Sequence, residues 1–140
     1  MEKRTVVDAG PIVALLIAAD RHHSWTRGVW GQLEPPLLTC EAVLSEAQHV
    51  VGRLGGDPLV VLEFVQNGAI NVAFTVEDEI ERLLELQRAY ADVPMSLADA
   101  CLVRMTELHE PWRVMTTDSD FRIYRRNRRQ VIPLLAPQGI

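Results

Sequence analysis

Short apolar segments alternate with helical segments along this chain, and this alternation constrains its fold more than any other feature. The apolar segments cover residues 5–7, 37–39, 70–74, 113–116 and 131–135. Short apolar strands separated by helices are typical of a parallel sheet covered by helices on both faces. A chain of 140 residues is long enough for one domain of this kind and too short for two. The prediction is therefore a single α/β domain spanning residues 1–140.

Helix signals occupy the intervals between these strands. Apolar residues at helical spacing predict a helix over 43–54, and Pro58 suits the first position of the helix that follows. Thr75 with Asp78 is interpreted as a capping box that opens a long helix, and Ser96 opens another helix that Pro111 ends. The complete set of predicted helices is 12–19, 23–32, 43–54, 58–66, 75–91 and the segment from 96 to Pro111.

The composition excludes several other classes of protein. Hydrophobic residues make up 48% and charged residues 24%, which is ordinary for a globular domain and excludes a disordered chain. Cys40 and Cys101 lie far apart and form no Cys-x-x-Cys pattern, so a disulfide scaffold or a thiolate zinc site is not indicated. The longest uncharged apolar run, residues 9–19, is too short to span a bilayer. We expect a cytoplasmic protein with no membrane contact.

The net charge of −5 argues against a general nucleic-acid binder, but the basic residues are unevenly distributed. Arginine suits bidentate contact with phosphate, so an arginine cluster can mark a surface that binds an RNA backbone. It can equally be a solvated surface that pairs with acidic helices, and the sequence leaves both interpretations open. The cluster comprises Arg122, Arg125, Arg126, Arg128 and Arg129.

Acidic residues recur at matching positions relative to the predicted strands and helices. Asp8 directly follows the first strand, and Asp118 and Asp120 follow the strand at 113–116. Glu46 and Asp99 lie in apolar stretches of two predicted helices. Because carboxylates in apolar surroundings are costly and repel one another, several that converge imply a cation between them. A set of oxygen ligands suits Mg²⁺ or Mn²⁺ rather than zinc.

Each of these acids also has a purely structural interpretation. Asp8 can be a helix cap, and Asp99 can be the far half of a capping box opened by Ser96. Glu46 can be a solvated helix residue, while Asp118 and Asp120 can be turn formers. His49 lies three residues after Glu46 on the same helical face and is either near the site or simply exposed.

Other chemistries find no support in the sequence. It contains no Gly-x-x-x-x-Gly-Lys loop, no Gly-x-Gly-x-x-Gly fingerprint and no Gly-x-Ser-x-Gly elbow. A phosphorylated aspartate would need a lysine near the strand ends, and the one lysine, Lys3, precedes the first strand. The acidic set is thus the main candidate site.

Four segments together resemble the PIN-domain nucleases, especially the VapC-type toxins. They are Val6-Val7-Asp8-Ala9-Gly10-Pro11, the stretch 39–50 with Glu46, Pro94-Met95-Ser96-Leu97-Ala98-Asp99, and Thr116-Thr117-Asp118-Ser119-Asp120-Phe121. The resemblance covers nearly the whole chain in order. Ala9 departs from it, because the family often has Thr or Ser there. The resemblance to these nucleases implies a three-layer α/β/α sandwich with a five-stranded parallel sheet, and usually a homodimer.

The resemblance also implies roles for individual residues in a metal-dependent endoribonuclease. Asp8, Glu46, Asp99 and Asp118 would be catalytic acids that bind Mg²⁺ or Mn²⁺, with Asp120 as an accessory metal ligand. Thr116 would support Asp8 or a metal-bound water by a hydrogen bond. The five clustered arginines would hold the RNA backbone.

A toxin of this type implies a cognate antitoxin protein as partner. Its expected docking surface is the apolar helix 59–65 together with Trp25 and Trp30, although that helix could instead fill the core or a dimer interface. Two other functions remain open. The protein could be a catalytically silent PIN-like module that binds RNA or protein, or a housekeeping RNA-processing nuclease without an antitoxin.

Overall fold

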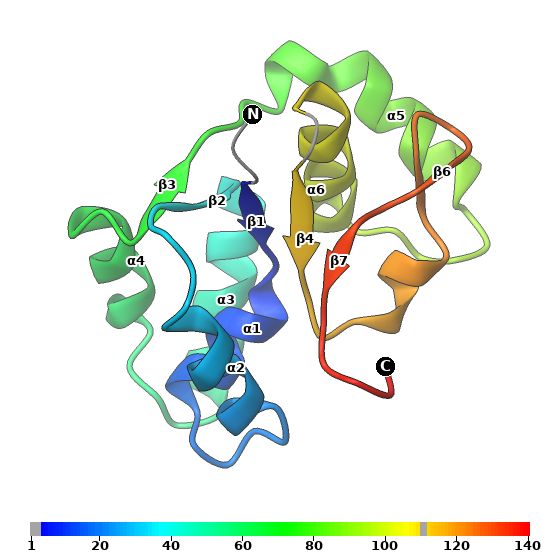
Figure 1. The fold of residues 1–140 in the computed structure, drawn as a ribbon. Coiled ribbons are helices and arrows are strands. Elements are labelled where there is room, and N and C mark those ends of the chain that lie inside the picture. The colour runs from blue at the N-terminus through cyan, green and yellow to red at the C-terminus, as the bar shows by residue number, and fades with distance from the viewer. Residues whose placement is uncertain (1–3, 110–111) are drawn as a thin grey trace.

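A computed structural model describes residues 4–109 and 112–140 and contains the predicted five-stranded parallel sheet (Figure 1). Its strands stand in the order β3-β2-β1-β4-β7, so β1 is central. Val6 of β1 pairs with Leu38 on one side and with Val114 on the other. The strands are β1 (Thr5–Val7), β2 (Leu37–Thr39), β3 (Ile70–Val72), β4 (Arg113–Met115) and β7 (Leu134–Leu135). The predicted α/β class is confirmed.

The helices cover both faces of this sheet. The connections from β1 to β2 and from β3 to β4 cross the sheet in opposite directions, so right-handed crossovers place their helices on opposite faces. Figure 1 shows α5 and α6 together on one side, away from α1, α2 and α4. No helix of the described residues is long and apolar enough to cross a membrane. The helices are α1 (Ala9–Leu16), α2 (His23–Trp30), α3 (Glu41–Arg53), α4 (Leu59–Gln66), α5 (Ile80–Ala89) and α6 (Leu97–Leu108).

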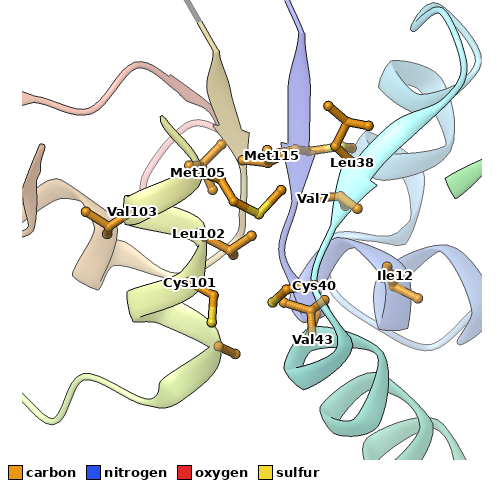
Figure 2. Close-up of a cluster of buried hydrophobic side chains, with 14 of the residues drawn as sticks. Val7, Ile12, Leu38, Cys40, Val43, Cys101, Leu102, Val103, Met105 and Met115 are labelled. Carbon is orange, nitrogen blue, oxygen red and sulfur yellow. The ribbon is translucent and has the colours of Figure 1, made fainter. Parts of the chain in front are cut away.

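Burial on both faces explains why the central strands are rich in apolar residues. Val6, Val7, Val114 and Met115 are all 0% exposed. Figure 2 shows Leu102 and Met105 of α6 packing toward β1 from one side. Fully burying an aliphatic side chain of this size contributes about 1.5–3 kcal/mol, so this core holds the ends of β1 and β4 rigidly.

The two cysteines are buried within this core, where their side chains face one another (Figure 2). Cys40 precedes α3 and is 1% exposed, and Cys101 on α6 is 0% exposed (Figure 2). Both are free thiols, as expected for small buried apolar residues.

The first helix begins earlier than predicted, at Ala9 rather than at residue 12. Asp8 caps it, because its Oδ1 accepts a hydrogen bond of 2.8 Å from the Ala9 N–H. Gly10 and Pro11 therefore lie in the first helical turn, where proline loses no hydrogen bond. A Cβ at Gly10 would overlap the hydroxyl of Thr117, so glycine lets α1 approach the segment after β4 without moving that side chain.

Two further predictions of local structure are wrong. Thr75 and Asp78 do not cap a helix: a 3₁₀ turn at Glu77–Glu79 precedes α5, which begins at Ile80 without a side-chain cap among the described residues. The predicted strand 131–135 is divided by Pro133. Gln130–Val131 (β6) pairs antiparallel with Arg125–Arg126 (β5), and only β7 joins the main sheet. Pro111, expected to end α6, lies outside the described residues, and α6 ends at Leu108.

Glu107 anchors the β5–β6 hairpin to α5 and α6. Its side chain is 1% exposed and accepts hydrogen bonds from Arg82 (2.9 and 2.7 Å) and Arg104 (3.2 Å). It also accepts one of 2.7 Å from the backbone N–H of Asn127 in the hairpin. Burial alone raises the pKa of Glu107, but these hydrogen bonds outweigh burial and hold the pKa below its ordinary value. The charged Glu107 side chain thus links α5, α6 and the β5–β6 hairpin.

Replacing Glu107 with Gln should lower the free energy of unfolding by about 2–4 kcal/mol at pH 7, because two arginines lose their buried partner. Since the folded-state pKa is lowered, the stabilisation is present above the ordinary glutamate pKa of 4.5 and lost as the pH falls through the folded value. Denaturant unfolding at pH 7 and pH 3 measures both effects. Glu81→Gln, at an exposed position on α5, is the control and should change stability little. Equal stabilities of the two variants at pH 7 would contradict this account.

Candidate active site

The structure brings four predicted acids together at the carboxyl edge of the sheet. Asp8 follows β1, Asp118 follows β4 and begins the 3₁₀ turn Ser119–Arg122, and Asp99 lies in the first turn of α6. The charge of Asp8 interacts with those of Asp99 and Glu46, and the charge of Asp99 interacts with those of Asp118 and Glu46. Acids from four separate elements therefore share one electrostatic environment.

Thr116 connects the ends of β1 and β4. Its hydroxyl donates a hydrogen bond of 2.8 Å to Oδ2 of Asp8 and accepts one of 3.0 Å from the N–H of Asp118. Thr116 is 0% exposed, so neither bond competes with solvent. The structure thus contains the Thr116–Asp8 hydrogen bond that the family resemblance implied.

Asp8 is buried, with 5% of its surface exposed. Burial raises its pKa to about 7, and the nearby charges of Asp99 and Glu46 add to this, while hydrogen bonds from Thr116 and Ala9 oppose it. An aspartate with this pKa is partly protonated at neutral pH unless a positive charge lies beside it.

Asp99 is also buried, with 8% of its surface exposed, and its pKa is raised for the same reason. Its backbone N–H donates to Oγ of Ser96 at 3.0 Å, as in a capping box, but Oδ2 of its side chain accepts a hydrogen bond of 2.9 Å from the Tyr124 hydroxyl. Burial raises the pKa of Asp99 to about 6, and the charges of Asp118 and Glu46 contribute to the increase. The helix-capping interpretation is therefore correct for the backbone of Asp99 but does not account for its side chain.

The remaining predicted residues lie closer to solvent. Oδ1 of Asp118 accepts a hydrogen bond of 2.9 Å from the Asp120 N–H, so Asp118 also shapes the turn, and both residues are half-buried. Glu46 is exposed on α3, within electrostatic reach of Asp8 and Asp99. His49 is exposed on the same helix, and no interaction among the described residues brings it to the acids.

The arginine cluster does not form one continuous surface. Arg126 is 4% exposed, and Arg125 donates to the backbone carbonyls of residues 122, 123 and 124. Arg128 pairs with Glu85 at 3.0 Å on the exposed side of α5. Arg122, which donates to the Ile140 carbonyl at 3.0 Å, and Arg129 are exposed. The Arg128–Glu85 pair matches the alternative interpretation of a solvated surface that pairs with acidic helices, whereas Arg125 stabilises the local backbone and Arg126 is buried.

The chemistry of the acids suits a divalent cation. Among the described residues, no three His, Cys, Asp or Glu side chains are arranged closely enough to hold a metal ion. Nevertheless, two buried carboxylates with raised pKa values are groups whose charged form lacks a compensating cation. Carboxylate oxygens are the ligands that Mg²⁺ and Mn²⁺ prefer. Asp8, Asp99, Asp118 and Glu46 fit such an ion by their donor type.

Sequence reasoning missed Tyr124, which contacts this site directly. It lies inside the arginine cluster, where its neighbours suggest a solvated surface, yet it is 0% exposed. Burial, followed by the hydrogen bond to Asp99, raises the pKa of the Tyr124 phenol above its ordinary value, so the phenol remains a hydrogen-bond donor. The available signal was a single aromatic residue within a segment rich in arginine.

The fold and the site define a class of protein, an α/β domain with an acidic centre at the carboxyl edge of its sheet. A family model described as the PIN domain matches residues 5–127. The chain therefore belongs to the PIN-domain family, and this membership supports the expected nuclease class.

A solved structure has the same fold. The crystal structure of VapC20 from Mycobacterium tuberculosis, described as a toxin that cleaves the sarcin–ricin loop, superposes with a TM-score of 0.78 at 20% sequence identity. The match covers 92% of this chain and 99% of that one. A search of curated proteins finds no match.

Replacing Asp8 with Asn should stabilise the metal-free protein by about 1–3 kcal/mol at pH 8, because it removes a buried charge. The folded-state pKa of about 7 lies above the unfolded value of 3.8, so the folded state binds more protons between them. The wild type should therefore lose stability as the pH rises from about 4 to about 7, and the variant should lose less. Thermal unfolding in EDTA at pH 5 and pH 8 measures this. A variant less stable than the wild type at pH 8 would contradict the burial argument.

Proposed function

We propose that this protein is an endoribonuclease that depends on Mg²⁺ or Mn²⁺ and acts as the toxin of a type II toxin–antitoxin pair. The observation that carries the proposal is the pair of buried carboxylates, Asp8 and Asp99, which share one electrostatic environment with Asp118 and Glu46. Burying a carboxylate costs free energy unless a partner compensates its charge, and such groups are common at functional sites. Membership of the PIN-domain family and the VapC20 fold agree with this.

In the proposed mechanism, Asp8, Asp99, Asp118 and Glu46 hold the cation, with Asp120 as an accessory ligand. When bound, such a cation would supply Lewis-acid activation of a water and would offset charge at the scissile phosphate. Thr116 keeps one oxygen of Asp8 in place through its 2.8 Å hydrogen bond. Because Asp8 and Asp99 are buried, charge interactions at these two carboxylates are stronger than they would be in water.

RNA contact is proposed for the exposed part of the arginine cluster. Arg122 and Arg129 have exposed side chains that can reach phosphate oxygens, whereas Arg126 is buried. Arg125 contributes indirectly, because it fixes the turn after Asp120 by binding three carbonyls. Arg128 can contact RNA only by giving up or sharing Glu85.

The proposed partner is an antitoxin protein, and its proposed docking surface is α4 with Trp25 and Trp30. Leu59 and Leu62 of α4 are 62% and 48% exposed, while Val61 is 0% exposed. The helix therefore anchors in the core and still presents apolar side chains to a partner. A homodimer in the cytoplasm is the proposed state of the toxin. A silent binding module and a housekeeping nuclease are the alternatives that experiment must separate from it.

Purified protein incubated with total RNA should produce fragments in Mg²⁺ or Mn²⁺ and none in EDTA. Asp8→Asn and Asp99→Asn should each reduce the cleavage rate by at least about 100-fold, because each removes a charged ligand of the cation. Circular dichroism establishes that both variants are folded. Cleavage by Asp8→Asn at the wild-type rate would overturn the assignment of the site.

A further inference from the structure

The segment that carries the arginine cluster also carries a side chain that points into the acidic site. Tyr124 lies between the 3₁₀ turn Ser119–Arg122 and β5, and it is 0% exposed. Its hydroxyl donates a hydrogen bond of 2.9 Å to Oδ2 of Asp99.

The contact determines which oxygen of Asp99 is available to a ligand. Oδ2 accepts the Tyr124 hydroxyl, and the carboxyl of Asp99 also has a hydrogen bond with the side chain of Ser96. A carboxylate held at one oxygen by a neutral donor has one orientation and presents the other oxygen for coordination. The phenol thereby limits the rotation of a group that would otherwise have two equivalent oxygens.

The tyrosine ring is itself held on two sides. It makes edge-to-face contacts with Phe121, at a centroid distance of 5.3 Å, and with Tyr90, at 5.1 Å. Its backbone N–H donates to the Asp120 carbonyl at 3.1 Å, and the next N–H, that of Arg125, donates to the Tyr90 hydroxyl at 2.8 Å. Aromatic contacts of this kind contribute about 0.5–1.5 kcal/mol each beyond burial. These contacts therefore fix the position of the Tyr124 hydroxyl.

The hairpin that follows Tyr124 is fixed at its far end as well. Glu107 accepts the backbone N–H of Asn127 and Glu85 pairs with Arg128, which joins the hairpin to α6 and α5. Tyr124 therefore lies between an anchored hairpin and the turn that carries Asp118 and Asp120. Both of these acids interact with its hydroxyl electrostatically.

We infer that Tyr124 is a positioning residue of the divalent-cation site, holding Asp99 through Oδ2 so that Oδ1 faces the ion. This inference rests on the proposed function and deepens it. The hairpin of the arginine cluster then has a task besides contact with RNA, because it closes over α6 and keeps Tyr124 against Asp99. In this role Tyr124 acts through its hydrogen bond to Asp99.

The test compares Tyr124→Phe with Tyr90→Phe by titrating metal-free protein with Mn²⁺ in a calorimeter. Tyr124→Phe keeps the ring and removes the hydroxyl, and it should raise the Mn²⁺ dissociation constant about 10- to 100-fold, as is typical for loss of a partner of a metal ligand. Tyr90→Phe removes a phenol hydroxyl bonded to the same hairpin but not to Asp99, and it should change the constant less than about twofold. RNA cleavage by Tyr124→Phe should recover substantially as the Mn²⁺ concentration is raised, whereas that of Asp99→Asn should not.

The outcomes separate this inference from the proposed function. If the wild type binds Mn²⁺ and cleaves RNA, and Tyr124→Phe binds Mn²⁺ with the wild-type constant, the positioning role is wrong and the nuclease assignment stands. An equal loss of affinity in Tyr90→Phe would also overturn it, because the effect would then belong to the hairpin as a whole. If the wild type neither binds Mn²⁺ nor cleaves RNA, the proposed function fails and this inference fails with it.

Discussion

The burial of the Asp8 carboxylate at the end of the central strand is the constraint on which the site depends. Taking a carboxylate out of water is costly, and the chain reduces this cost with the Ala9 N–H at the start of α1 and the Thr116 hydroxyl at the end of β4. Neither donor removes the penalty, since the pKa of Asp8 stays near 7. A positive charge beside Asp8 would therefore lower the remaining cost of burying its carboxylate.

Thr116 links the buried Asp8 to its neighbours at the carboxyl edge of the sheet. Because its hydroxyl both donates to Asp8 and accepts from the Asp118 N–H, it couples the end of β1 to the turn after β4. The parallel pairing of Val7 with Met115 brings these two ends side by side. Asp99 is supported in a similar way from α6, by Ser96 at its backbone and by Tyr124 at its side chain. Each buried acid thus has a neutral hydroxyl donor at one of its oxygens.

Sequence reasoning succeeded where the signal was local. Thr5–Val7 and Leu37–Thr39 were predicted with their observed bounds, since a short apolar run between turn residues has few alternatives in a domain of this size. Ser96 caps α6 as expected. The capping box at Thr75 failed because a 3₁₀ turn intervenes before α5, and the strand at 131–135 failed because Pro133 separates residues that join two different sheets. The competing structures are a 3₁₀ turn at Glu77–Glu79 and a short antiparallel hairpin between β5 and β6.

The sequence by itself determined the α/β class, the positions of most strands and the acids that follow them, because apolar runs and strand-end residues are properties of neighbours in the chain. Only the tertiary structure decided which charges are buried and what each one contacts. It placed Arg126 in the interior, Arg128 against Glu85 and the Tyr124 hydroxyl against Asp99. Tyr124 and Asp99 are 25 residues apart in the sequence, and Arg128 and Glu85 are 43 residues apart. The physical reason is that burial and hydrogen bonding depend on proximity in space, which a folded chain creates between segments that have no relation in sequence.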